Sequence, residues 1–490
     1  MRITISALGP IRHEAQFELK PLTIFIGPNN SGKTWLAYTL AAVFGEFGIS
    51  QFTDQERRTS ILENYSPVAS AINELLTTGI VSMDIYQFAH DYGEKYFEDV
   101  ISTVKTNLSL FMGTRCISFD ALKMSTELND TQPLFLKRIQ ETAFHANVGF
   151  TRQKSDHTYG RQNAPFRISK QKERNNISMY LTFEDQSETE VPEETMREII
   201  EERIIWYVFR TLHRALFFDV VVLPTERTTF LTLPFSTLSL DDQAINQIRD
   251  QHIRPLSMPV SDYVSSVISV TATGTKETAE RKQQAEKNPQ VQKYIDLSYV
   301  LETEILNGEV DFSMPEPEFG RDIIFHPNGC TFPLEISLAS SMVKELAPLV
   351  FHLRYSAQPN ELLIIDEPEM NLHPKAQVQI LEFLVMLVNA GLNVLITTHS
   401  PYILDHLSNL TQAYQHPDKE HIQDEFYLKD CRAFIDGNKV SAYLIDKGIL
   451  KDALYDEELD WDTFGEISDR ITKIYFLSYQ DSKEHPLDSL

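Results

Sequence analysis

The sequence predicts an α/β protein in which a mixed sheet with a parallel core is flanked by helices. Two observations predict it. From residue 322 onward, strand-like runs such as "ELLIID" and "NVLITT" alternate with a helix-length stretch, "PKAQVQILEFLVMLVNAG", and this alternation is typical of a parallel sheet covered by helices. Near the start, the continuous apolar run "LTIFI" enters a glycine-bearing loop, "GPNNSGKT", and then the helical stretch "WLAYTLAAVF".

These patterns divide the chain into six segments. Residues 1–50 form an N-terminal lobe, which opens with "RITISAL" and "AQFELK", two strands that alternate apolar and polar residues and are therefore half-exposed. The other segments are 51–215, a large and mostly helical insertion with a basic loop; 216–235, a strand that returns to the core sheet; 236–320, a second helical insertion; 321–410, a C-terminal lobe; and 411–490, a small acidic α/β extension.

Two of these segments leave alternatives open. In the second insertion, the polar stretch "TGTKETAERKQQAEKNPQVQKYI" predicts a short helical hairpin, which would be either a dimer arm or a solvated excursion. The last segment has 18 Asp and Glu against 9 Lys and Arg, with strand-like "RAFIDGNKVSAYLI" and helical "FGEISDRITKIYFLSY". Its acidic run "YDEELDWD" is the candidate metal set of a nuclease, but a charge run is usually a solvated face. No intrinsic nuclease is expected.

Composition restricts the partners and the compartment. The net charge is −26, from 44 basic and 70 acidic residues, which argues against a surface that coats nucleic acid. Residues 152–174 carry seven basic and two acidic side chains and are either a solvated loop or a local nucleic-acid patch. No apolar run reaches membrane-spanning length, the N-terminus lacks a signal-peptide layout, and three scattered cysteines form no metal or disulfide pattern. A cytoplasmic protein without membrane contact is expected.

The loop "GPNNSGKT" is a full phosphate-loop match between a strand and a helix. Its glycines let successive backbone N–H groups face phosphate oxygens at a helix N-terminus. Lys33 is expected to reach the β- and γ-phosphates of ATP, and Thr34 to offer its hydroxyl to Mg²⁺. The residues expected to hold the nucleotide in this loop are Gly27, Asn29, Asn30, Ser31, Gly32, Lys33 and Thr34.

Two later strands end in chemistry-bearing side chains. Asp366 and Glu367 close the buried run "LLIIDEP" at the edge of the sheet where ligands bind. Asp366 fits the orientation of Mg²⁺, and Glu367 the polarisation of an attacking water, since phosphoryl transfer needs positioning and charge stabilisation. One βα unit later, His399 leaves the strand of "NVLITTHSP" and fits a sensor of the γ-phosphate. ATPase activity is therefore predicted.

These three motifs, in this order, resemble ABC-type ATPases of the RecF, SMC and OLD kind. They are more closely similar to the bacterial "AAA family" ATPases found in anti-phage systems such as PARIS and Septu, as are the opening "ISALGPIRHEAQFELKPLTIFIGPNNSGK" and "LPTERTTF". The matched parts, roughly residues 1–45, 217–230 and 322–405, make up less than a third of the chain. The resemblance implies an ABC-ATPase head that sandwiches two ATPs against a second head.

In such a pair, the signature segment of one head completes the ATP site of the other. "ASSMVKEL" is in the expected place, with Ser340 at the signature serine and with Ser341 and Met342 where glycines are usual. The serines retain a hydroxyl and helix N-terminal amides, the donors that a γ-phosphate needs. Met342 puts close backbone approach in doubt, and Lys344 is either a further phosphate contact or a solvated helix lysine.

Further residues are assigned by position alone. Asn371, in "EMNLHP", matches the loop that lies across the head–head interface, or else is a turn asparagine. Glu226 and Arg227 of "LPTER" end a buried strand and either approach the nucleotide or form a structural ion pair. The equivalent of the glutamine lever cannot be identified by pattern.

Three functions fit these motifs. The first is a slow, regulatory ATPase that dimerises, or assembles further, through its heads and controls a separate effector, such as a nuclease or toxin, in anti-phage defence. The second is a DNA-binding, RecF- or SMC-like repair or maintenance ATPase. The third is a nucleotide-binding scaffold that hardly turns over. The acidic balance favours the first, because a protein partner needs no broad basic face.

Overall fold

The computed structural model describes residues 1–148, 151–153, 159–161, 166–181, 193–232, 256–313, 321–454 and 473. Its central six-stranded sheet has the order β11-β15-β16-β3-β17-β18. The first five strands are parallel, and β18 joins antiparallel to β17. The strands are β3 Leu22–Ile26, β11 Val220–Leu223, β15 Leu362–Asp366, β16 Asn393–Thr398, β17 Val440–Asp446 and β18 Ile449–Asp452. The α/β class is confirmed.

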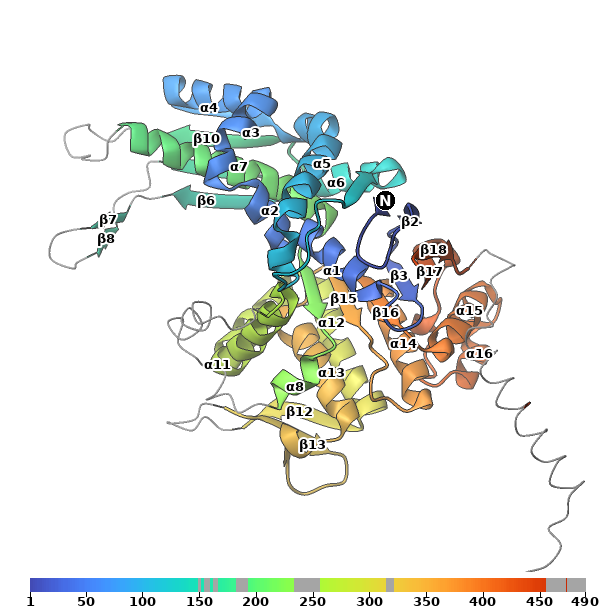
Figure 1. Ribbon diagram of the computed structural model, residues 1–490. Helices are drawn as coiled ribbons and strands as arrows, with labels where there is room; N and C mark the ends of the chain where they lie inside the picture. Colours follow the sequence, from blue (N-terminus) through green and yellow to red (C-terminus); the bar gives the residue numbers. More distant parts are fainter. Residues whose placement is uncertain are drawn as a thin grey trace, which may run out of the picture.

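Helices cover both faces of this sheet, which explains why its strands are almost uniformly apolar. Every residue of β3 and of β15 is buried. Alternate residues face opposite ways: Phe25 joins a core with α1, Lys33–Phe44, whereas Ile24 and Ile26 join a core with α13, Ser341–Phe351, and α14, Pro374–Asn389. In Figure 1 the sheet lies between these helix layers.

The N-terminal lobe and the first insertion contain more strand than predicted. β1 Arg2–Ser6 pairs with β2 Ala15–Glu18 and with β5 Lys123–Glu127. A second antiparallel sheet has the order β4-β10-β9-β6 and lies beside α7, Glu193–Leu216 (Figure 1). These strands are β4 Ile80–Asp84, β6 Phe144–Val148, β9 Phe166–Lys170 and β10 Asn176–Leu181, with the short hairpin β7 Thr151–Gln153 and β8 Tyr159–Arg161 nearby in sequence. Insertion 51–215 is therefore mixed α/β, because its strands bury one face by alternation.

Helices of this insertion and of the rest of the chain complete the fold. They are α2 Glu46–Phe52, α3 Arg58–Asn64, α4 Ser66–Thr78, α5 Ile85–Phe111, α6 Gln132–Glu141, α8 Arg227–Leu231, α11 Met258–Lys287, α12 Pro289–Val300, α15 Pro401–Gln415 and α16 Lys419–Ile422. A third small sheet joins β12 Gly308–Phe312, β13 Ile323–Pro327 and β14 Leu334–Glu335. None of the described helices combines the length and hydropathy that a bilayer crossing requires.

The polar stretch of the second insertion spans the end of α11 and the start of α12. The Asn288 side chain accepts a hydrogen bond from the Gln290 amide and caps α12. Arg281 is buried, and its guanidinium donates to the carbonyls of Leu353, Arg354 and Ala357. These contacts pack the hairpin onto the end of the α13 segment, so it is neither of the two expected forms, a projecting arm or a solvated excursion.

The acidic C-terminal segment is not a separate extension. Its strand β17 pairs in parallel with β3 at the centre of the molecule. The Ser441 hydroxyl donates to the Glu18 carbonyl at 2.8 Å, and the Tyr443 hydroxyl accepts from the Glu18 amide at 2.8 Å. The predicted boundary at residue 411 therefore divides one sheet. The expected helix "FGEISDRITKIYFLSY" and the acidic run "YDEELDWD" lie outside the described residues, apart from Lys473.

This placement makes β17 a contributor to the stability of the whole head. We expect Ile445→Ala to lower the free energy of unfolding by about 2–5 kcal/mol, because its fully buried side chain leaves a cavity. Ile449→Ala, at a side chain 44% exposed on the edge strand, is the matched control and should change it by less than about 0.5 kcal/mol. Denaturant unfolding measures both, and equal effects would contradict the role of β17.

Candidate ATP site

Three parallel strands bring the motifs to one edge of the sheet. β15, β16 and β3 are consecutive neighbours, and their carboxyl ends lead to Asp366, His399 and the phosphate loop. Ligands of open parallel sheets bind at this edge. Residues more than 300 positions apart in sequence are thereby in direct contact, as the hydrogen bonds below record.

The phosphate loop has the backbone that its glycines permit. Gly32 has φ 107° and precedes the first residue of α1, and Asn30 has φ 62°. A Cβ at Gly27 would lie 2.1 Å from the Ile445 carbonyl oxygen, so no larger residue fits between the loop and β17. The Ser31 hydroxyl is buried and has no hydrogen-bond partner among the described residues, as expected of a donor that bonds a ligand.

Lys33, the first residue of α1, extends its side chain back across the phosphate loop. Its ammonium group donates to the carbonyls of Gly27, at 2.9 Å, and Pro28, at 3.0 Å, and lies 3.1 Å from His399 Nε2. Burial lowers the pKa of Lys33, although the Glu367 carboxylate partly offsets that effect. A buried cation in a loop of amide donors is suited to an anionic ligand.

Asp366 joins the phosphate loop to β16. The Thr34 hydroxyl lies 3.0 Å from each Asp366 carboxylate oxygen, and the Thr397 hydroxyl donates to Oδ1. Asp366 is fully buried, and burial raises its pKa to about 6 against the opposing hydrogen bonds. A hydroxyl and a carboxylate this close are the hard oxygen ligands that Mg²⁺ prefers.

Glu367 and His399 form a pair beside Lys33. Glu367 Oε1 lies 2.7 Å from His399 Nε2, and this hydrogen bond holds the pKa of Glu367 below its usual range. The Glu367 amide donates to both the carbonyl and the hydroxyl of Thr397 at 3.1 Å. Its backbone is left-handed, with φ 51°, which is strained for a non-glycine residue. Glu367 is thus an ionised carboxylate at the mouth of the site.

Some residues of this site were not assigned from the sequence. Glu369 is buried, and its Oε1 accepts from the Thr398 hydroxyl, at 2.7 Å, and from the His399 amide, at 2.6 Å. Thr397 bonds Asp366 and Glu367 as described above. The available signal was a pair of hydroxyl residues inside the buried run "NVLITT", since buried polar groups need partners.

The signature segment starts α13 with its donors exposed. Ser340 is the N-cap, and its hydroxyl accepts from the Val343 amide at 3.3 Å. Ser341 is exposed in the first turn, and Met342 is half-buried. Lys344 donates to the Ser337 carbonyl at 2.6 Å, which ties its ammonium group to the loop before the helix.

The remaining assigned residues lie just behind the site. Arg227 is buried in an ion pair with Glu345, with Arg227 Nε 2.9 Å from Glu345 Oε2, whereas Glu226 is exposed. Arg227 is therefore structural, but its partner is Glu345 and not Glu226, the residue that the sequence paired with it. Asn371 has φ 60°, and its side-chain amide donates to Glu345 Oε1 at 2.9 Å. Asn29 lies exposed on the phosphate loop.

Residues 1–404 match the family described as "AAA ATPase domain". This match covers most of the chain and includes every motif described above.

The chain belongs to the AAA ATPase domain family.

Individual relatives match this chain over a short segment or at low sequence identity. The Old nuclease of Escherichia phage P2 is 37% identical over 78 residues, which are 16% of this chain and 13% of that protein. An Smc head bound to the C-terminal winged-helix domain of ScpA aligns at 11% identity and TM-score 0.37, covering 92% of this chain and 96% of the other. The SMC head domain from Thermotoga maritima aligns at 9% identity and TM-score 0.30, covering 92% and 97%. The assignment depends on the family match.

For an AAA ATPase, the residues present fit a nucleotide with Mg²⁺. The orphaned Ser31 hydroxyl, the loop amides and Lys33 suit phosphate oxygens. Thr34 and Asp366 would hold the metal, which supplies charge neutralisation at the phosphates. Among the described residues, no cluster of three or more His, Cys, Asp or Glu could hold a metal by itself.

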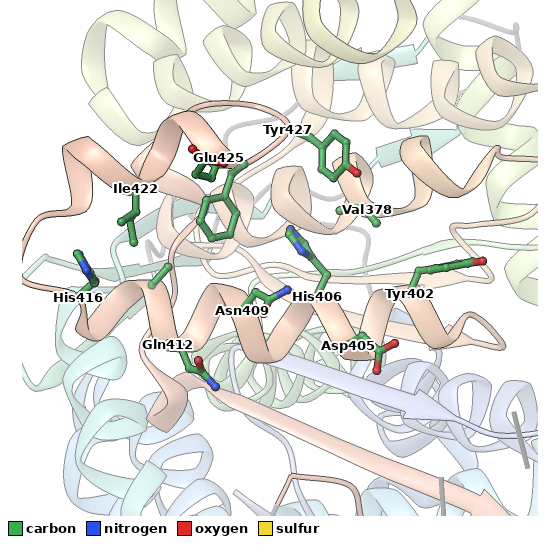
Figure 2. Close-up of a pocket in the computed structure, with 12 residues that line it drawn as sticks. Val378, Tyr402, Asp405, His406, Asn409, Gln412, His416, Ile422, Glu425 and Tyr427 are labelled. Atoms are coloured by element: carbon green, nitrogen blue, oxygen red, sulfur yellow. The ribbon is translucent and has the colours of Figure 1, made fainter. Parts of the chain in front are cut away.

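A separate cavity of about 700 Å³ is lined by residues of α14, α15 and the segment around α16 and by none of these motifs. Figure 2 shows His406, Tyr427 and Tyr402 among its lining side chains. His406 there bonds the buried Glu382 carboxylate at 2.8 Å, and that carboxylate also accepts from the Tyr427 and Leu428 amides. His406 of this pair forms part of the cavity wall, and the pair's hydrogen bonds among the described residues involve no nucleophilic side chain.

Lys33→Ala should abolish ATP binding. The lysine supplies the buried charge of the loop, and charge-assisted bonds contribute about 1.5–3 kcal/mol each, so affinity should fall at least tenfold. A fluorescent ATP analogue measures the dissociation constant. Lys123→Ala, at an exposed lysine in β5, is the control and should bind as the parent does. Equal affinity in both variants would contradict the assignment.

The Mg²⁺ requirement should depend on pH through Asp366. Its pKa is raised to about 6, so the carboxylate is ionised at pH 7.5 and becomes protonated below pH 6. We expect the Mg²⁺ concentration for half-maximal hydrolysis to rise about tenfold per pH unit below that value. The affinity of free ATP for Mg²⁺ is measured in the same buffers, so that its own pH dependence can be subtracted from the profile of the protein. A flat profile from pH 5 to 7.5 would remove Asp366 as the ligand.

Proposed function

We propose that this chain is a regulatory ATPase that hydrolyses Mg²⁺-bound ATP slowly between two of its heads. The observation that carries the proposal is the meeting of Lys33, Thr34, Asp366, Glu367 and His399 at one sheet edge. Lys33 and the loop amides bind the phosphates. Glu367, kept ionised by His399, orients and polarises the attacking water, and His399 lies between that carboxylate and the Lys33 ammonium group.

The two-headed arrangement is supported by the exposed start of α13. Ser340 and Ser341 present hydroxyls and free helix amides to solvent, and the hydrogen bonds of these two serines in this chain involve only α13 and its own backbone within the described residues. The N-terminus of a helix can bind an anion such as a phosphate group through its backbone amides. A second copy of the chain supplies the ATP phosphate, so each site is completed in trans. Met342, half-buried beside these serines, restricts close approach and makes turnover slow.

We propose that this cytoplasmic ATPase controls a separate protein effector in bacterial anti-phage defence. The strongly negative net charge of the chain is consistent with a protein partner. The net charge of −26 disfavours broad nucleic-acid contact. In the basic stretch 152–174, Lys170 is buried and donates to the carbonyls of Gln140, Thr142, Gln171 and Arg174. That lysine is unavailable to phosphates, which weakens the alternative of a RecF- or SMC-like DNA clamp. A salt-sensitive gel shift with plain duplex DNA would instead favour the clamp.

Glu367→Gln should bind ATP and lower turnover by about a hundredfold or more, because the carboxylate that polarises water is lost. The ATP-bound assembly should accumulate as a larger species in light scattering. Affinity purification of this variant with ATP then identifies what co-purifies, and capture of a nuclease or toxin would support the regulatory role. Unchanged turnover in Glu367→Gln would remove this residue from the mechanism.

Ser340→Arg and Ser341→Arg should leave ATP affinity within about twofold and block hydrolysis, because these side chains act on the partner's nucleotide. Mixing Ser341→Arg with Lys33→Ala chains should restore one complete site and part of the activity. The matched control is Ser337→Arg, at an exposed residue outside the helix. If neither serine variant changes turnover, the trans contact is wrong.

A further inference from the structure

A buried cluster connects the signature helix to the turn that carries Glu367. Its centre is the ion pair of Arg227, from α8, with Glu345, from α13, whose side chains are 1% and 0% exposed. Arg227 Nε donates its hydrogen to the Glu345 carbonyl at 3.2 Å and lies 2.9 Å from Glu345 Oε2, which makes an ionic contact but accepts no hydrogen bond among the described residues. Two unpaired buried charges would be highly unfavourable, so α8 and α13 must stay together.

The remaining donors of Arg227 hold the backbone around the catalytic carboxylate. Nη1 donates to the Asp366 carbonyl at 2.7 Å and to the Pro224 carbonyl at 2.9 Å, and Nη2 donates to the Glu367 carbonyl at 2.9 Å. The Glu367 carbonyl belongs to the residue in the left-handed conformation. A strained backbone persists only where its surroundings over-determine it, and the planar fork of arginine does so here.

The second carboxylate oxygen of Glu345 extends the cluster to the loop after Glu367. Glu345 Oε1 accepts from the Thr228 hydroxyl at 2.6 Å and from the Asn371 side-chain amide at 2.9 Å. Asn371 is itself left-handed. The turn is thus held at both ends, at Glu367 through Arg227 and at Asn371 through Glu345.

The other end of this connection is exposed. Glu345 lies four residues after Ser341 in α13, so the two residues share one face of the helix, one turn apart. A ligand that binds at the N-terminus of α13 therefore lies one helical turn from the Glu345 carboxylate, which holds the loop that follows Glu367.

We propose that Arg227 and Glu345 are positioning residues that make the signature helix and the Glu367 turn move as one body. The trans consequence rests on the proposed function: when the serines of α13 engage the partner's ATP, the same displacement sets the Glu367 carboxylate on its own ATP. The binding of ATP to one head thereby changes the position of the catalytic carboxylate in the other head. Within the described residues, the hydrogen bonds of the Arg227 guanidinium and the Glu345 carboxylate go to the segment around α8, to α13 and to the end of β15 with the turn after it, and none goes to the phosphate loop, so the pair should act on turnover and not on affinity.

Glu345→Gln tests this directly, because it keeps the shape of the side chain and removes its charge. We expect ATP affinity within twofold of the parent and a kcat at least tenfold lower. The matched control is Glu302→Gln, which breaks another buried pair, with Arg354; both side chains also form hydrogen bonds with Val310, and neither bonds the Glu367 turn within the described residues. Glu302→Gln should lower the thermal midpoint comparably and leave kcat within twofold. Equal kcat losses in both variants, or an unchanged kcat in Glu345→Gln, would overturn the proposal.

Milder variants keep the test independent of folding. Arg227→Lys retains the charge but replaces the planar fork, whose separate nitrogens reach Glu345, Asp366 and Glu367, by a single ammonium group, so it should lower turnover as Glu345→Gln does. Thr228→Val removes one hydrogen bond to Glu345 and should give a smaller loss of kcat than Glu345→Gln. Normal turnover in a folded Arg227→Lys protein would show that the fork is not needed and would overturn the positioning role.

Amide hydrogen exchange separates this inference from the proposed function. In the parent, ATP should slow exchange in α13 and in residues 367–371 together; in Glu345→Gln, protection should persist in α13 and be lost in 367–371. Protection of both segments in the variant would overturn the coupling. Absence of any α13 protection in the parent, with Ser341→Arg fully active, would instead remove the trans contact of the proposed function and the coupling that depends on it.

Discussion

The site depends on one buried carboxylate. Asp366 is fully buried at the end of a central strand and holds the hydroxyls of Thr34, from the helix after the phosphate loop, and Thr397, from the neighbouring strand. Burial raises its pKa to about 6, so Asp366 is ionised at neutral pH but at a desolvation cost that an exposed aspartate does not have. This cost is consistent with a metal ligand and has no evident purpose in a purely structural residue.

Three further polar groups of the site lie in contact with one another. The Lys33 ammonium group, the His399 ring and the Glu367 carboxylate follow one another within hydrogen-bonding distance. Nε2 of His399 donates to the Glu367 carboxylate and so cannot also accept from Lys33, but a ligand that displaces Lys33 from the loop carbonyls changes the surroundings of His399 and Glu367 as well. Binding and catalysis therefore share one set of contacts.

Behind this chain of groups, Arg227 performs a different task. It donates to main-chain carbonyls of the Asp366–Glu367 turn and pairs with Glu345 of the signature helix, and within the described residues none of its hydrogen bonds goes to the phosphate loop. The catalytic side chains project from backbone that is itself held by charge-assisted hydrogen bonds. The two layers explain how a strained turn can be kept in place beside an open site.

The sequence alone determined the α/β class, the phosphate loop, and the carboxylate and histidine strand ends, because these depend on local spacing and on uniformly apolar strands. It did not reveal that β17 completes the core sheet, since strand pairing across more than 400 residues leaves no local pattern. It also left Arg227 and Lys170 ambiguous. Only the tertiary structure showed that both side chains donate hydrogen bonds to buried main-chain carbonyls. The sequence could not show this, because the contacts of a long side chain depend on which distant segment of backbone packs against it.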